Sequence, residues 1–271
     1  MTSITKAFRS EWVKLSRPGL LAGCIGPMVA LVALATFGMM RVASLQVEGR
    51  RPNAGFARVL SEGSGGWLVG LEAATSMLGV IALVTFASNI GGEYKNATLR
   101  SLLAIEPRRL QLLAGKLLAL CSLTAAAVAI AIVVAGISSV GFGNAFGVET
   151  SSWLSGSGLA KAMPAYLNVT LACIGWGIVG GFLAITLRTS AAAIGIGIGY
   201  LVVGEPILAR AVIAPVLDAQ AAWFPGEVLR AFAMGGNGSS SYLRAALLAL
   251  LYVGAFGAIA GALFRRRDVL T

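Results

Sequence analysis

The stretch GGEYKNATLRSLLAIEPRRLQLLAGK, residues 91–116, is a polar segment that lies directly between two long apolar runs. Within it are the carboxylates Glu93 and Glu106 and the cations Lys95, Arg100, Arg108, Arg109 and Lys116. So many charges are not tolerated in the hydrocarbon of a bilayer, because nothing there solvates or pairs them. The stretch therefore predicts a membrane protein from one face of which this segment protrudes.

The composition of the whole chain supports a membrane protein. Of the 271 residues 57% are hydrophobic and only 12% are charged, about half the charged fraction of a soluble domain. Many of the 35 glycines lie inside apolar runs, where they let helices pack closely in a bilayer. We expect an all-α integral membrane protein that folds as one transmembrane domain over residues 1–271.

The apolar runs predict six transmembrane helices, because about 20 apolar residues are needed to cross the hydrocarbon core. Pro27 predicts a kink in the first helix, and Gly91-Gly92 is a suitable end for the second. Only Arg188 and Thr189 separate the fourth and fifth helices, which predicts a tight helical hairpin. The six spans are residues 19–40, 67–90, 112–140, 162–187, 190–208 and 243–264.

The orientation follows from where Lys and Arg concentrate. With six spans, both termini and residues 91–116 share one face of the membrane. That face carries more Lys and Arg than the other face, although its loops contain far fewer residues. The positive-inside rule places this face on the cytoplasmic side of a bacterial cell membrane. Arg50, Arg51 and Arg58 lie on the other face and weaken the contrast in charge between the two faces. The basic residues lie mostly at the ends of apolar runs, so we expect contact with membrane lipids and not with nucleic acid.

Residues 4–17 predict an amino-terminal interfacial helix. Ile4, Phe8, Trp12 and Leu15 fall on one face of this helix, and most cations fall elsewhere. Such a helix lies at the boundary between acyl chains and headgroups. A frayed tail is the alternative. The predicted membrane-interface anchors are Phe8, Arg9, Trp12, Lys14 and Arg17.

Between the fifth and sixth spans, residues 207–242 form a broken outer segment. They are mostly apolar, but Pro215 and Pro225 interrupt them and Asp218, Glu227 and Arg230 charge them. Irregular backbone at this depth is tolerated only when it packs against protein. We expect two short helices that dip into the outer leaflet.

Sequence motifs exclude several kinds of site. No G-x-x-x-x-G-K-[ST] loop is present, so the chain has no usual means of binding and hydrolysing ATP by itself. The chain contains no His, which excludes a Cys/His zinc site, and we expect no metal. Residues 175–180, GWGIVG, match a dinucleotide-binding pattern but lie inside a span, where helix packing is the better interpretation.

Two acids, Glu72 and Glu205, lie closest to the membrane interior. An intramembrane carboxylate is a candidate for a transport path. Both residues lie near the outer ends of their spans, however, so interfacial solvation or pairing with Arg210 is the alternative.

The opening segment contains the signals of a short helix. Asn96 or Thr98 is a suitable cap, Leu99 and Leu103 belong to an apolar stripe, and Pro107 ends the helix. An amphipathic helix on the cytoplasmic face either rests on lipid or docks into a groove of a soluble partner.

These residues resemble a known family. The run EYKNATLRSLL, residues 93–103, followed by Glu106-Pro107-Arg108-Arg109 and Lys116, is similar to the type-2 permease subunits of ATP-binding-cassette (ABC) exporters. The amino-terminal Arg9, Glu11, Lys14 and Arg17, the six spans and the broken outer segment also resemble that family. Ala97 stands where the family usually has Gly, a conservative difference.

The resemblance implies that the cytoplasmic helix between spans 2 and 3 is a coupling helix, which docks into a separate ATPase subunit. It implies a working unit of two cassette ATPases, which bind ATP and Mg, and two permeases, identical or related. This chain would be no enzyme by itself and would hold no cofactor. The ATPase-coupling residues that it implies are Glu93, Thr98, Leu99, Arg100, Leu103, Pro107 and Arg109.

The apolar spans indicate an apolar or amphipathic cargo, such as a drug, lipid or natural product. An ion-coupled secondary transporter that uses Glu72 and Glu205 is the main alternative, and a non-transporting membrane scaffold or sensor is a third.

Overall fold

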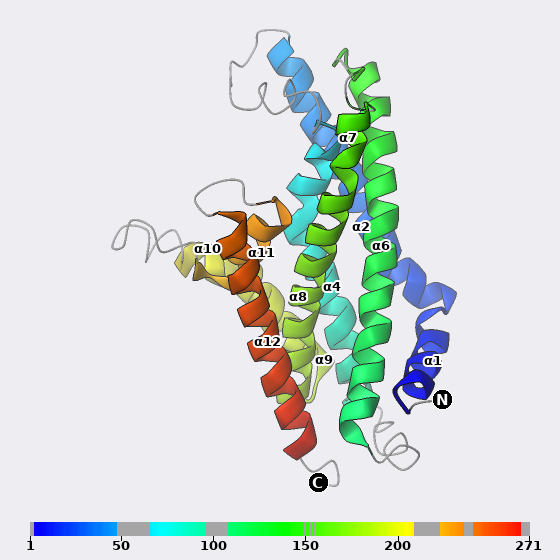
Figure 1. Cartoon of the computed structure of the whole chain (residues 1–271), viewed down its shortest axis with the longest axis vertical. Coiled ribbons are helices and arrows are strands. Elements are labelled where there is room, and N and C mark those ends of the chain that lie inside the picture. The colour runs from blue at the N-terminus through cyan, green and yellow to red at the C-terminus, as the bar shows by residue number, and fades with distance from the viewer. Residues whose placement is uncertain are drawn as a thin grey trace.

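The computed structural model describes residues 3–47, 66–95, 108–148, 150–151, 153, 155–208, 223–235 and 241–266, and these form a helical bundle without strands (Figure 1). Five of its helices are long and apolar enough to cross a membrane. They are α2 (Pro18–Val47), α4 (Val69–Lys95), α6 (Arg109–Ala145), α8 (Ala162–Leu187) and α12 (Tyr242–Arg266). The shorter helices are α1 (Ser3–Leu15), η1 (Gly66–Leu68), α7 (Gly156–Ala160), α9 (Ser190–Ile198), η2 (Gly199–Gly204), α10 (Glu205–Ile207) and α11 (Pro225–Ala233).

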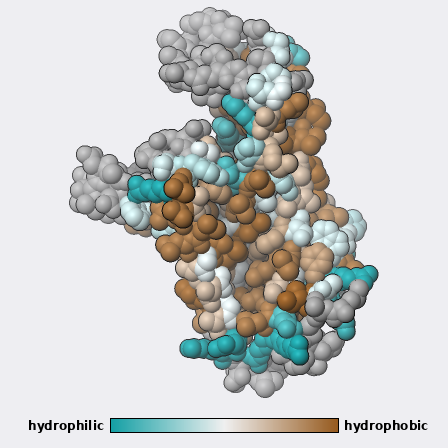
Figure 2. Space-filling model, viewed as in Figure 1, coloured by the Kyte–Doolittle hydropathy of each residue, from teal (hydrophilic) through white to brown (hydrophobic). Residues whose placement is uncertain are grey.

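The bundle has two distinct ends. Helix α1 and the last turn of α12 lie at the same end, the lower one in Figure 1, here called the terminal end. Hydrophobic side chains cover the middle of the visible face, and hydrophilic residues gather at its lower edge (Figure 2). This distribution is the one expected of a multi-pass membrane protein, because polar groups gather where water is available.

Helices α4 and α8 form the centre of the bundle, and glycines let them approach closely. A Cβ on Gly79 would lie 2.5 Å from the Trp176 ring, and one on Gly177 would lie 2.7 Å from the Phe86 ring. A Cβ on Gly180 would meet the backbone of Leu83. Residues 175–180 therefore serve helix packing, which confirms the interpretation of the glycine pattern inside this span.

The expected end of the second span at Gly91-Gly92 is wrong, because α4 continues to Lys95. Gly91 serves a close contact instead: a Cβ there would lie 2.6 Å from the backbone nitrogen of Ser190, at the start of α9. Gly92 meets nothing within 4 Å. Gly91 thus allows α9 to pack against α4, and the glycine pair does not end the helix.

The hairpin between α8 and α9 is confirmed. Helix α8 ends at Leu187, Arg188 adopts a left-handed conformation with φ 56°, and Thr189 is extended before α9 begins. The fifth apolar segment is interrupted, however, because after Ile198 the backbone widens into the six-residue π-helix η2. The Gly195/Gly199 pair in this segment meets nothing within 4 Å in the described part of the chain.

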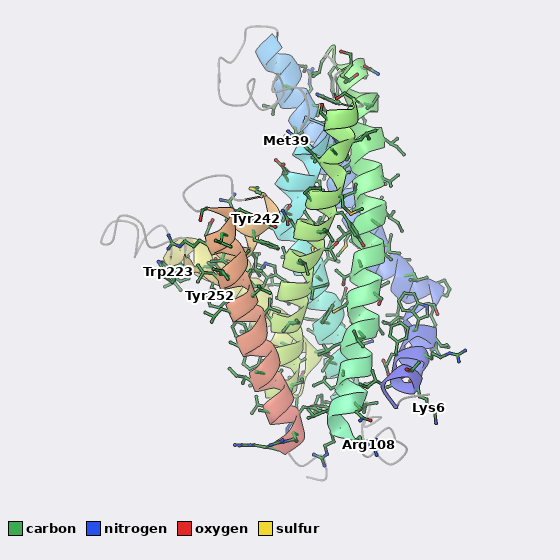
Figure 3. The ribbon with its side chains drawn as sticks, in the orientation of Figure 1. Lys6, Met39, Arg108, Trp223, Tyr242 and Tyr252 are labelled. Atoms are coloured by element: carbon green, nitrogen blue, oxygen red, sulfur yellow. The ribbon has the colours of Figure 1, made fainter. Side chains whose placement is uncertain are left out.

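Of the two short helices expected in residues 207–242, the structure describes one, α11, because α10 ends at Ile207 within the predicted fifth span and residues 209–222 lie outside the described ranges. Helix α11 is held against its neighbours at the upper end of α12. The Phe232 and Tyr242 rings stack with centroids 5.6 Å apart, and the Tyr242 hydroxyl donates to Oδ1 of Asn168 on α8 at 2.9 Å. Tyr242, Tyr252 and Trp223 lie close together in this region (Figure 3).

Candidate functional site

Helix α1 packs against the beginning of α6 at the terminal end. A Cβ on Gly115 would lie 2.5 Å from the Ala7 Cβ, so only glycine allows this approach. Ala7, Glu11 and Leu15 follow one another at four-residue spacing and therefore share one helix face. All three are buried, and the carboxylate of Glu11 is fully buried. An acidic side chain is thus carried into the contact between two helices.

Lys116 on α6 meets that carboxylate. Its Nζ donates to Glu11 Oε2 at 2.7 Å, to Glu93 Oε1 at 2.7 Å and to Asn89 Oδ1 at 2.8 Å. The Lys116 side chain is only 4% exposed. Each of its three ammonium protons therefore has an acceptor, which is the condition under which a buried charge is tolerated.

Lys14 completes the arrangement. Its Nζ lies 2.7 Å from Glu11 Oε1 and 3.5 Å from Glu93 Oε1. Two ammonium groups and two carboxylates then balance to zero net charge. We call Glu11, Lys14, Asn89, Glu93 and Lys116 the charge cluster; it joins α1, the end of α4 and the start of α6.

The electrostatics of α1 follow from this pairing. Burial alone would raise the pKa of the Glu11 carboxyl, but the Lys116 and Lys14 ammonium groups outweigh burial and hold that pKa below its ordinary value. Burial would lower the pKa of Lys14, but Glu11 and Glu93 outweigh it and raise that pKa above its ordinary value. Both groups are therefore charged over a wide range around neutral pH.

The charge cluster brackets the predicted coupling segment. Glu93 stands just before residues 96–107 and Lys116 follows them, so the Glu93–Lys116 ion pair joins the two stems of that segment. Arg109 is the first residue of α6. The predicted coupling residues Thr98, Leu99, Arg100, Leu103 and Pro107 lie outside the described residues.

The predicted anchors on α1 divide into two groups. Phe8 and Trp12 stack with ring centroids 5.9 Å apart, and Trp12, Arg9 and Arg17 are exposed. Lys14, expected to face lipid headgroups, instead pairs with the carboxylates of Glu11 and Glu93. Helix α1 is therefore an amphipathic helix with one face against protein.

Glu205, one of the two predicted intramembrane acids, binds the start of α11. Its Oε1 accepts from the backbone N–H of Glu227 at 2.8 Å and its Oε2 from that of Gly226 at 3.0 Å. A carboxylate at the first turn satisfies N–H groups that have no partner inside the helix. This explains the burial of Glu205, which is 4% exposed. The predicted alternative partner, Arg210, lies outside the described residues.

A cavity of about 270 Å³ adjoins Glu205, with Thr75, Trp176 and Arg230 also in its lining. Glu72 is half-buried in the first turn of α4 and does not line this cavity. The two acids therefore do not share this cavity. Among the described residues no group of three His, Cys, Asp or Glu side chains is placed to hold a metal ion.

Sequence reasoning missed Glu11 and Asn89 as site residues and took Lys116 only as part of a motif. The signals were present: Glu11 is the single acid in the amino-terminal helix and shares a face with Ala7 and Leu15, and Asn89 is an amide inside an apolar run. A polar residue in such a position needs a partner, and Lys116 is the cation at the matching depth of the next span.

Comparison with known proteins gives one assignment. The curated proteins contain no match to this chain. Residues 28–270 match a family described as "Protein of unknown function (DUF2705)". Because this match covers most of the sequence, the chain belongs to the DUF2705 family.

Proposed function

We propose that this chain is the membrane-spanning permease subunit of an ATP-driven exporter of the ABC type. It would move an apolar or amphipathic substrate, such as a drug, lipid or natural product, out of the cell. The proposal is supported by the resemblance of residues 93–116 to type-2 permeases and by the charge cluster around the stems of that segment.

The observation that carries the proposal is the linkage of three helices at one point. Lys116 binds Glu93 and Glu11 at 2.7 Å each, so the end of α4, the start of α6 and α1 are held together at the base of residues 96–107. A force on that segment would then act on all three helices as a unit. Transmission of motion from a docked partner into the bundle requires such a rigid base.

The proposed layout has six spans. Five of them are the long apolar helices. In this proposal α9, η2 and α10 together supply the remaining span, the fifth in chain order, over residues 190–207. The terminal end would face the cytoplasm, in agreement with the cations that gather there. In a pair of permeases, the open Gly195/Gly199 pair is a surface on which a helix of the second permease would pack.

The energy would come from two copies of a separate cassette ATPase, which would bind ATP and Mg. This sequence has no phosphate-binding loop with which to bind ATP itself. Closure of the ATPases would push the docked segment, and the paired bundles would change their access from one side of the membrane to the other. No covalent chemistry in this chain is required.

The experiment is co-purification with a candidate cassette ATPase. We expect Leu103→Asp and Arg100→Glu to abolish both ATPase association and transport-stimulated ATP hydrolysis, because each would disrupt the docking face. Arg266→Glu, an exposed charge reversal on α12, is the matched control and should leave both unchanged. If association and stimulated hydrolysis survive both substitutions, the coupling assignment is wrong.

An ion-coupled secondary transporter is the rival, and the cavity beside Glu205 is the observation in its favour. It predicts pH-dependent flux in liposomes without ATP, and loss of that flux in Glu205→Gln and Glu72→Gln. The exporter predicts no flux without the ATPase. Flux from liposomes that contain only this chain therefore decides between the two.

A further inference from the structure

A second cavity, of about 690 Å³, opens between α2 and α4 beside α1. From the α1–α2 side Arg17, Leu20 and Gly23 line it, and from α4 Thr85, Ser88 and Asn89. Its volume lies within the range of cavities that hold small molecules. It adjoins the charge cluster, two of whose members, Lys14 and Glu93, also contribute to its wall.

The cavity is polar at one end and apolar at the other. Helices α2 and α4 run in opposite directions (Figure 1), so Arg17 and Glu93 both lie at the terminal end, and Cys24 and Val84 lie deeper in the bundle. Leu20 and Leu123 add apolar surface. A ligand that fits this gradient has a polar head at the terminal end and an apolar tail directed along the bundle.

The charge at the polar end is unbalanced. Within the charge cluster the two ammonium groups and two carboxylates cancel, whereas Arg17 is exposed and has no ion pair with any described residue. The Asn89 Oδ1 is committed to Lys116, and its amide nitrogen has no acceptor within the described ranges. The polar end therefore offers a guanidinium and further N–H donors to an anion.

The deeper part of the cavity is open to an apolar chain. A Cβ added to Gly23 would meet nothing within 4 Å, so the space in front of this glycine is not filled by a neighbouring helix. Gly92, at the polar end, is open in the same way. Unfilled apolar space beside a spanning helix is space that an acyl chain of the surrounding lipid can occupy.

We propose that this cavity binds one anionic phospholipid of the membrane. Its phosphate lies at Arg17, one acyl chain lies along Gly23 and Val84, and the second chain stays in the bilayer. Charge complementarity selects an anionic over a zwitterionic lipid, because only an anionic lipid neutralises the Arg17 guanidinium, which has no ion pair among the described residues. The inference does not depend on an ATPase partner, and the site would hold the turn between α1 and α2 against α4.

The test is a lipid titration of the purified full-length chain, measured by native mass spectrometry. Phosphatidylglycerol and phosphatidylcholine with identical acyl chains are the probes. We expect the first to bind about five- to tenfold more tightly, which is the effect of one favourable contact between a cation and an anionic headgroup. Equal binding of the two lipids would overturn the proposal.

Two pairs of variants locate the site. Arg17→Gln should remove the preference for phosphatidylglycerol, and Arg266→Gln, an exposed arginine at the same end, should keep it. Gly23→Leu should weaken binding of both lipids by filling the space for the chain, and Gly38→Leu, on the same helix and equally open, should not. Thermal unfolding of each variant without added lipid verifies that the fold is retained.

Other occupants give different results. If Arg17→Gln and Arg266→Gln reduce the preference equally, the lipid binds only to general surface charge and the proposal fails. If glycerol phosphate, which has no acyl chain, displaces the lipid at similar concentration, the site binds a free anion and the proposal also fails. If Gly23→Leu binds both lipids as the unsubstituted chain does, no acyl chain enters the cavity.

Discussion

Replacement of Lys116 by Met would remove the cation at the centre of the charge cluster. Glu11 is fully buried and, among the described residues, would keep only Lys14, whose side chain is 40% exposed; Glu93 would keep, among the same residues, a 3.5 Å contact with Lys14. Breaking a buried ion pair from one side costs about 3–5 kcal/mol, because the remaining charge is left without compensation. Since Lys14 remains, we expect a loss near the lower limit, about 3 kcal/mol.

A double-mutant cycle isolates the Glu11–Lys116 interaction. Glu11→Gln alone should cost about 2–3 kcal/mol, because Lys116 retains Glu93 and Asn89. The double variant Glu11→Gln with Lys116→Met should cost at least about 1.5 kcal/mol less than the sum, because it no longer leaves one partner of the pair buried alone. The assay is equilibrium unfolding in mixed micelles, followed by tryptophan fluorescence.

Lys6→Met is the control, because Lys6 is exposed on α1 and extends away from the bundle (Figure 3). Its cost should stay within about 0.5 kcal/mol. The reasoning is refuted if Lys116→Met costs no more than this control, or if the costs of the two single substitutions simply add in the double variant.

Three further predictions concern Gly91, the pH dependence of the charge cluster, and Glu205. Gly91→Ala should destabilise the fold by about 1–3 kcal/mol, since the new Cβ would meet the Ser190 backbone. The control is Gly92→Ala at the neighbouring position, which should be neutral or slightly stabilising. Equilibrium unfolding curves of the two variants compare them. The stability that Glu11 contributes should be present above pH 4.5, the ordinary pKa, and be lost as the pH falls through the lowered folded-state pKa. The difference in free energy of unfolding between the unsubstituted chain and Glu11→Gln, here called the gap, should therefore close in acid. The stability that Lys14 contributes should be present below pH 10.5 and be lost as the pH rises through its raised pKa. A gap that widens in acid would contradict this. Glu205→Gln should loosen α11 and cost about 1–2 kcal/mol through two weakened bonds to backbone N–H groups; faster amide exchange at Gly226 and Glu227 is the expected readout, and unchanged exchange there would contradict it.

The long helices were predictable from the sequence, because their length is set by the hydrocarbon core and their composition by the absence of water there. Residues 162–187, for example, are predicted and observed as one helix. The interruption of the fifth segment at Gly199 was not predictable, because a π-helix leaves no mark in apolar periodicity. The extension of α4 past Gly91 was missed because a glycine that packs and a glycine that ends a helix look alike in sequence.

The candidate site was predictable only in part. The sequence indicates that Glu93, Lys14 and Lys116 lie near the terminal end, because each adjoins the end of an apolar run. It does not indicate that they meet, since the two carboxylate partners of Lys116, Glu93 and Glu11, lie 23 and 105 residues away in the chain. The periodicity of α1 predicts a lipid-facing helix. Only the close approach of α1 to Gly115 on α6 shows that Glu11 points inward.

The distance in sequence between Glu11 and Lys116 has a consequence for biosynthesis. The chain is made from its amino terminus, and the two residues are separated by 105 positions. At about 5–20 residues per second, roughly 5–20 s pass between the synthesis of the carboxylate and that of its cation. During this interval Glu11 has to remain in water at the membrane surface, so α1 reaches its final place only after the start of α6 has left the ribosome. Synthesis of the start of the third long helix is therefore the event that lets the first helix of the chain take its place.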